Sequence, residues 1–200
     1  MRIPAALLLV LAACNSPSAS PPPVAASTTP SAAPMPSAPA AAASSATAMA
    51  TDAPDPLVGQ VAPDFTTKAQ DGSTVHLSAL KGKNVIVYFY PKDETPGCTK
   101  EACSFRDAWA NLAKTGAVLI GVSADSLDSH KAFVDHWKLP FLLVSDPDGS
   151  IGKLYNVPFQ SYHQRQTVEI GPDGKVKKVY RKVDVTVHAQ QVTDDLSKAT

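Results

Sequence analysis

The chain has 200 residues, its 18 basic residues are balanced by 18 acidic ones, and 44% of it is hydrophobic. A formal charge of zero offers no attraction to a nucleic-acid backbone, so nucleic-acid binding is disfavoured. The length allows one domain of ordinary size with an appendage. Eleven of the 18 prolines lie at or before Pro56, all ten glycines lie at or beyond Gly59, and Arg2 is the only charged residue before Asp52. We therefore expect an extended N-terminal segment and a folded domain over residues 57–200.

Residues 1–13 have the layout of an export signal. Arg2 precedes an apolar run that is too short to span a membrane and that is followed by small residues. The junction Leu11-Ala12-Ala13-Cys14 resembles the lipobox of bacterial lipoproteins, in which cleavage precedes the cysteine and that cysteine is acylated. This resemblance implies an exported protein held in the cell envelope by a lipid anchor on Cys14, with its domain facing the periplasm. The alternative is ordinary signal cleavage nearby, with Cys14 lost or free.

The segment that follows Cys14 is unlike a folded domain. Asn15 stands where an aspartate would resemble an inner-membrane retention signal of enterobacteria, which favours the outer membrane. Residues 16–56 are mainly Ala, Ser, Pro and Thr, and lack the apolar and aromatic groups that offset the entropy of folding. We expect residues 14–56 to form an acylated cysteine and a disordered tether, extended by its prolines.

The first strong pattern of the domain is a buried strand followed by a helix. Residues 85–90 form a continuous apolar run that ends at Pro91, which is typical of a central strand buried on both faces. Beyond a Pro/Gly turn, apolar residues recur at spacings of three and four, which predicts an amphipathic helix over residues 98–113, ended by Gly116. These residues are Ala102, Phe105, Trp109 and Leu112.

The rest of the domain alternates in the same way. We expect a second buried strand over residues 117–122, a helix over 126–137 that Ser126 caps, and a third strand over 141–144. A hairpin follows, with strands 165–170 and 176–182 around Pro172-Asp173-Gly174, and a closing helix occupies the last dozen residues. This order predicts an α/β fold, a thioredoxin-like sandwich with a central mixed β-sheet flanked by helices.

Two cysteines remain for the domain, Cys98 and Cys103. A zinc site would need four ligands, and the five histidines show no metal-ligand spacing with these cysteines, so we expect no metal. In an exported protein a structural disulfide is the ordinary expectation. However, residues five apart in an α-helix have Cα atoms roughly 8 to 9 Å apart, whereas disulfides need about 7 Å or less. If both residues are helical, the bond closes only after the first turn or more unwinds.

Cys98 is placed to act as a nucleophile. It lies at the expected start of a helix, where unpaired backbone N–H groups and the helix dipole favour a thiolate. Thr95 can offer a hydroxyl to the same space, although by itself it would be a plain turn or cap residue. Pro91 and Pro96 stiffen the loop and remove two N–H donors.

The segment Pro91-Lys92-Asp93-Glu94-Thr95-Pro96-Gly97-Cys98-Thr99-Lys100-Glu101-Ala102-Cys103 resembles the active-site segment of the peroxiredoxin Q group, also called bacterioferritin comigratory proteins. It contains the pattern Pro-x-x-x-Thr-x-x-Cys and a further cysteine five positions on. Similarity extends over nearly all of residues 57–200, through Ala62-Pro63-Asp64-Phe65, residues 121–126, His130-Lys131-Ala132-Phe133 and residues 139–148. The tether and acylation site are additions to the family pattern.

The resemblance implies a peroxidase that needs no cofactor. The Cys98 thiolate would attack a hydroperoxide, become a sulfenic acid and release water or an alcohol. Cys103 would resolve it as a disulfide, which a thioredoxin-like dithiol protein then reduces. Cytosolic thioredoxin would lie on the wrong side of the membrane, so an exported reductant is expected. The resemblance also implies a monomer.

It further implies a binding site made of Pro91, Thr95, Gly97, Cys98 and Arg165. Thr95 would hydrogen-bond the peroxide and the sulfur, the amides of Gly97 and Cys98 would complete a polar cradle, and the Arg165 guanidinium would stabilise the thiolate. Family members more often have an aromatic residue at the place of Val168.

From the residues alone, Arg165 is not distinguished from Arg106 or Arg181. Glu101 is expected in the first turn of the helix, complementing its dipole, with a role in proton handling as the lesser alternative.

Two other functions remain open. One is an exported thiol–disulfide oxidoreductase, although the chain lacks Cys-x-x-Cys. The other is a non-catalytic, lipid-anchored protein with a structural disulfide. The rate at which peroxide oxidises Cys98 separates the three.

Overall fold

The computed structural model describes residues 54–198. The predicted export signal, the predicted lipidation site Cys14 and nearly all of the predicted tether lie outside the described residues. Within residues 54–198, no helix combines the length and the apolar character needed to cross a membrane. Asp55, which the sequence analysis put near the end of the tether, contacts the domain: its carboxylate accepts from Arg181 Nε at 2.6 Å and from Nη2 at 3.1 Å.

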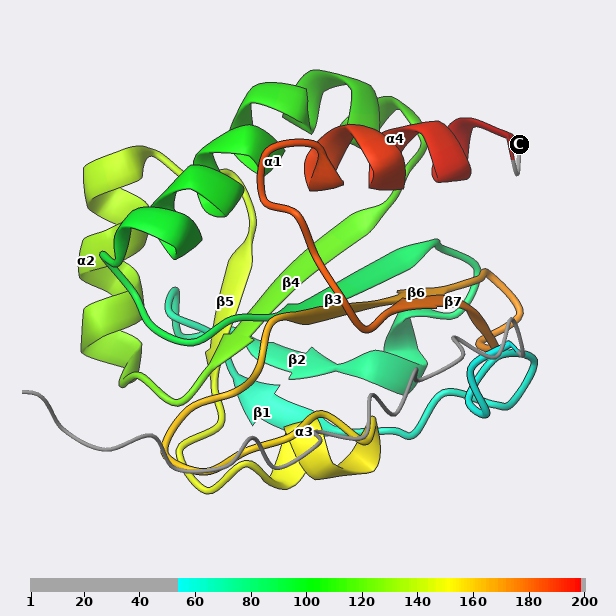
Figure 1. The fold of residues 1–200 in the computed structure, drawn as a ribbon, viewed down its shortest axis with the longest axis horizontal. Coiled ribbons are helices and arrows are strands. Elements are labelled where there is room, and N and C mark those ends of the chain that lie inside the picture. Colours follow the sequence, from blue (N-terminus) through cyan, green and yellow to red (C-terminus); the bar gives the residue numbers. More distant parts are fainter. Residues whose placement is uncertain (1–53, 199–200) are drawn as a thin grey trace, which may run out of the picture. The chain divides into compact units, whose positions relative to one another are not determined.

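A five-stranded mixed sheet forms the centre of the domain, in the order β5-β4-β3-β6-β7 (Figure 1). The strand predicted to be central is central: β3 pairs in parallel with β4 and antiparallel with β6. β4 pairs in parallel with β5, and β6 is antiparallel to β7. The strands are β3 (Val85–Phe89), β4 (Val118–Ser123), β5 (Leu142–Ser145), β6 (Gln166–Ile170) and β7 (Val176–Tyr180).

Side-chain alternation along β3 divides the core into two layers. Ile86, Tyr88 and the following Tyr90 belong to one apolar cluster, whereas Val87 and Phe89 belong to the other. Because all five residues of β3 are buried, the strand reads in the sequence as an unbroken apolar run. The thioredoxin-like α/β fold predicted from that pattern is confirmed.

The first layer holds three helices, which pack on one face of the sheet through the cluster of Tyr88 and Tyr90. α1 and α4 lie side by side, and α2 packs beside β5 (Figure 1). As predicted, Ser126 caps α2, accepting from the Ser129 N–H at 3.2 Å. The helices are α1 (Pro96–Lys114), α2 (Leu127–Trp137) and α4 (His188–Lys198).

The second layer contains short elements that the sequence analysis did not predict. An antiparallel pair of three-residue strands, a 3₁₀ helix and a one-turn helix surround the cluster of Val87 and Phe89. Each is too short to show a period of hydrophobicity. They are β1 (Thr66–Lys68), β2 (Thr74–His76), η1 (Leu77–Leu80) and α3 (Ser150–Leu154).

Candidate active site

Cys98 lies at the junction of the central strand and the first helix. The chain leaves β3 at Phe89, turns, and enters α1 at Pro96, with Thr95 as the N-cap. Proline suits the first helical position because its missing N–H would have no partner there. Cys98 is therefore the third helical residue, among the backbone N–H groups that have no intrahelical acceptor. Its side chain is only 2% exposed and belongs to the same apolar cluster as Tyr90.

A guanidinium reaches this buried sulfur from 67 residues along the chain. Arg165 directly precedes β6, whose Gln166 pairs with Phe89 at the end of β3, so strand pairing delivers Arg165 to the turn. Its Nη2 donates to Cys98 Sγ at 3.1 Å. A hydrogen bond from a cation is strongest to an anionic acceptor, so Arg165 is placed to stabilise negative charge that develops on the reacting atoms. The guanidinium also lies beside Gly97, where an added Cβ would stand 3.5 Å from Nη2.

Glu101 forms an ion pair with the second terminal nitrogen of the Arg165 guanidinium. The expectation that it lies in the first turn and complements the helix dipole was wrong, because α1 begins at Pro96 and has no acidic residue in its first turn. The Glu101 side chain is 1% exposed, and its Oε2 accepts from Arg165 Nη1. Burial raises the pKa of Glu101 to about 7, even though Arg165 favours its charged form. Burial opposes the charge of Arg165 too, but Glu101 and Cys98 outweigh it and raise the Arg165 pKa. Cys98 and Glu101 are three residues apart on one helix face, a spacing that could have revealed the shared partner.

The Thr95 hydroxyl makes a local bond in place of the predicted one to sulfur. Its Oγ1 donates to the Lys92 carbonyl at 2.9 Å, while its own carbonyl accepts from the Thr99 N–H at 2.8 Å. The hydroxyl oxygen keeps its acceptor capacity, which suits it to receive an O–H from a bound hydroperoxide. Pro91, at the start of the turn, is half-buried.

Cys103 is on the same helix, and both cysteines are free thiols. Its side chain is half-buried, and burial raises its pKa, so the thiol form is favoured at neutral pH. A regular helix holds the Cα atoms of these two residues roughly 8 to 9 Å apart, too far for a disulfide. Forming the bond therefore requires unwinding of α1 between them.

The two other arginines that the sequence left open are engaged elsewhere. Arg106 donates to Asp107 and to the Trp137 carbonyl, and Arg181 binds Asp55. Arg165 is thus the arginine that the fold brings to Cys98. Among residues 54–198, no group of three or more His, Cys, Asp or Glu side chains is arranged to hold a metal ion. The arrangement suits nucleophilic chemistry by a buried sulfur that lies at a helix N-terminus and beside a guanidinium.

Comparisons with known proteins point to one family. Residues 58–179 match the AhpC/TSA family. A peroxiredoxin bcp of Coxiella burnetii is 44% identical over 147 residues, which are 70% of this chain and 97% of that protein. A chloroplastic peroxiredoxin Q of Populus jackii is 50% identical over 125 residues, 61% of this chain but only 59% of that longer protein. The structure of the Xanthomonas campestris bacterioferritin comigratory protein, described as reducing alkyl peroxides, superposes with a TM-score of 0.65 at 33% identity, covering 68% of this chain and 91% of that one.

Proposed function

The chain belongs to the AhpC/TSA family and to its peroxiredoxin Q and bacterioferritin comigratory protein group, and from this premise we propose that Cys98 is the residue that reduces the peroxide. The protein is a thiol-dependent peroxidase whose substrates are hydroperoxides and whose reductant is a thioredoxin-like dithiol protein. The observation that carries the assignment of Cys98 is its burial at the start of α1 with Arg165 Nη2 at 3.1 Å from the sulfur.

In the proposed first step the Cys98 thiolate attacks the distal oxygen of the hydroperoxide. The S–O bond forms as the O–O bond breaks, and sulfur is oxidised to a sulfenic acid while the leaving oxygen takes up a proton and departs as water or an alcohol. Negative charge grows on both peroxide oxygens as the bond breaks. The Arg165 guanidinium and the N–H groups of Gly97 and Cys98 are fixed donors that stabilise this charge, and Thr95 orients the peroxide.

In the proposed second step Cys103 resolves the sulfenic acid. Its sulfur attacks Cys98 Sγ, an S–S bond forms, and the sulfenic oxygen leaves as water with the thiol proton. α1 unwinds between the two residues to allow this. Two thiol–disulfide exchanges with the dithiol reductant then return both cysteines to the thiol form, after which the helix can rewind.

A titration with peroxide tests the assignment. One equivalent of hydrogen peroxide added to the reduced protein should consume two thiols within seconds, measured by thiol labelling and mass spectrometry of the Cys98–Cys103 peptide. A thiol–disulfide oxidoreductase would react slowly, and a protein with an inert disulfide negligibly. If both thiols still titrate as free after a minute, Cys98 is not the reacting residue.

We also propose that the enzyme acts at the cell envelope, as a lipoprotein anchored through Cys14 in the outer membrane with its domain in the periplasm. The support is the sequence pattern of residues 1–14, which resembles an export signal with a lipobox. In a bacterium that processes lipoproteins, the wild-type chain should fractionate with membranes. Cys14→Ser should move it to the soluble fraction, with its peroxidase activity unchanged. Equal membrane association of the two would reject the anchor.

A further inference from the structure

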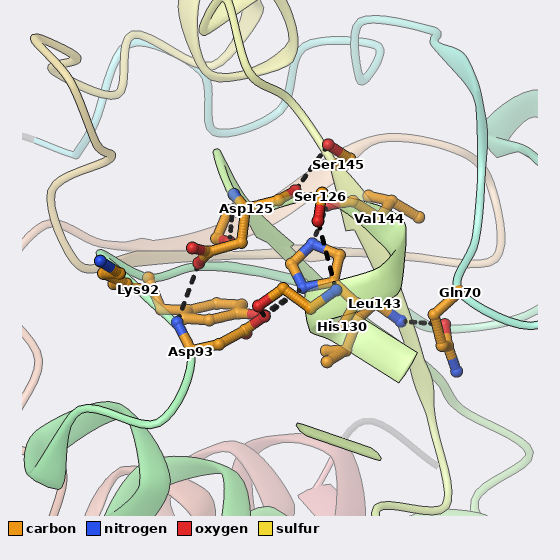
Figure 2. Close-up of polar contacts among 12 residues, drawn as sticks. Gln70, Lys92, Asp93, Asp125, Ser126, His130, Leu143, Val144 and Ser145 are labelled. Carbon is orange, nitrogen blue, oxygen red and sulfur yellow. Dashed lines mark hydrogen bonds and ion pairs between the residues drawn. The ribbon is translucent and has the colours of Figure 1, made fainter. Parts of the chain in front are cut away.

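A buried polar network surrounds Asp93, in the turn between β3 and α1 (Figure 2). Its centre is the carboxylate of Asp93, a residue that is 5% exposed. Oδ1 accepts from the Tyr90 hydroxyl at 2.7 Å, and Oδ2 accepts from Ser129 Oγ at 2.7 Å and contacts His130 Nδ1 at 2.8 Å. One side chain from the residue after β3 and two from α2 thus contact a single turn residue, and the proposed chemistry uses none of the three.

The contact between Asp93 and His130 is shielded from water, since the two side chains are 3% and 0% exposed. His130 is fully buried, and its second ring nitrogen, Nε2, lies 3.2 Å from the Val144 carbonyl of β5. Both ring nitrogens therefore lie within hydrogen-bond distance of an oxygen atom. Burial works against the charge of Asp93, but its hydrogen bonds from His130, Tyr90 and Ser129 outweigh it and lower its pKa. Separating Asp93 from these donors is costly because it leaves a buried carboxylate without hydrogen-bond partners.

The backbone of Asp93 is fixed as well. Its N–H donates to Asp125 Oδ2 at 2.8 Å, and the same oxygen accepts from Ser123 Oγ at 2.8 Å. Ser145 Oγ in turn donates to the Asp125 carbonyl at 2.6 Å. Asp93 is therefore tied to the ends of the three parallel strands β3, β4 and β5 and to α2, through both its side chain and its main chain (Figure 2).

The two residues that follow Asp93 make weaker side-chain contacts with the rest of the domain. Glu94 has a left-handed backbone, with φ of +58°, and its carboxylate contacts His136 and Trp137 at the surface. The side chains of Glu94 and His136 are 47% and 62% exposed, so this contact contributes little stability. The Thr95 side chain bonds only to Lys92, within its own turn. The side chains of Glu94 and Thr95 thus make fewer buried contacts than that of Asp93.

We propose that the Asp93 network is an anchor at which the unwinding of α1 stops. The inference rests on the proposed function, since that function requires α1 to unwind between Cys98 and Cys103. With Asp93 held, unwinding is confined to residues that follow it, and Pro91–Asp93 keep their conformation in the thiol and disulfide forms. The wall of the peroxide pocket then persists through the catalytic cycle, and only residues 94–103 have to refold after reduction.

Amide hydrogen exchange of the full ¹⁵N-labelled chain, with both cysteines reduced and after oxidation with diamide, tests the anchor. Diamide forms the disulfide without peroxide, so the result does not depend on the peroxidase assignment. On oxidation, amides of residues 97–103 should exchange at least about tenfold faster, while the Asp93 amide changes by less than about twofold. A comparable acceleration at Asp93 would overturn the proposal.

Two matched tyrosine variants separate the anchor from general stability. Tyr90→Phe removes only the hydroxyl that donates to Asp93. Tyr155→Phe removes the hydroxyl of another buried tyrosine, in the other core layer, which donates to the Pro63 carbonyl at 2.6 Å. In the disulfide form, Tyr90→Phe should accelerate exchange of the Asp93 amide about fivefold, and Tyr155→Phe should leave it within about twofold. Equal effects of the two variants would show that the network has only a structural role.

Discussion

Replacing Arg165 with methionine should lower the rate constant for oxidation of Cys98 by hydrogen peroxide by about two orders of magnitude. The variant loses the cation that contacts the sulfur at 3.1 Å and the fixed donors for the charge that grows on the peroxide oxygens. Loss of one such donor in other enzymes costs about 100- to 1,000-fold. Stopped-flow tryptophan fluorescence on the reduced protein, with peroxide in excess, measures the rate constant directly.

Arg165→Lys is the matched control, because it keeps the charge but not the planar pair of donors. Its rate should fall between those of the wild type and Arg165→Met. A rate for Arg165→Met within about threefold of the wild type would remove Arg165 from the proposed chemistry. Circular dichroism should show an unchanged fold, because Glu101, left without its cation, can become neutral by binding a proton.

That protonation gives stability a pH dependence of known sign. The pKa of Glu101 in the folded protein is about 7, above its ordinary value of 4.5, so the folded state binds the proton more tightly than the unfolded state. Stability from this group is complete below about pH 4.5 and is lost as the pH rises through about 7. Arg165→Met should steepen this loss, since Arg165 lowers that pKa, and the double variant Arg165→Met with Glu101→Gln should flatten it. Urea unfolding at pH 5 and pH 8 measures the difference.

Serine variants of the two cysteines should block different steps of the proposed cycle. Cys103→Ser should react with the first peroxide at the wild-type rate but stop at the sulfenic acid, because no thiol remains to resolve it. Mass spectrometry should then show a gain of one oxygen atom, and turnover with a dithiol reductant should fall about a hundredfold. Cys98→Ser should consume no peroxide. Wild-type turnover by Cys103→Ser would mean that the disulfide between the two is not an intermediate.

Where the core determines the local structure, the sequence predicted it well. β3 is buried on both faces and α1 has an apolar stripe, so their residue patterns match those of ordinary buried strands and amphipathic helices. Cys98 could be placed at a helix start for the same reason. The strands β1 and β2 were missed because three residues with mostly exposed side chains carry no recognisable alternation.

The partners of Cys98 could not be predicted from local patterns, because they depend on strand pairing. Arg165 resembles any charged residue beside a strand until β6 is aligned on β3. The position of Glu101 was close enough to suggest a shared face, but its burial was not evident from a helix that otherwise alternates normally. Asp93 and His130 are 37 residues apart, and each looks like a surface residue until α2 is packed on the sheet.

Because Cys98 and Cys103 lie on one helix, the proposed cycle also lets the dithiol reductant distinguish the oxidised form of this protein, which it reduces, from the reduced form. In the helical form Cys98 is 2% exposed, so its sulfur is not accessible to a partner protein. In the proposed cycle, only the oxidised enzyme, with the first turn of α1 unwound, presents the disulfide that the reductant must break. Once that disulfide is reduced and the first turn rewinds, the surface that the reductant binds is no longer present. The reduced peroxidase then dissociates from its reductant and does not compete with oxidised enzyme for it.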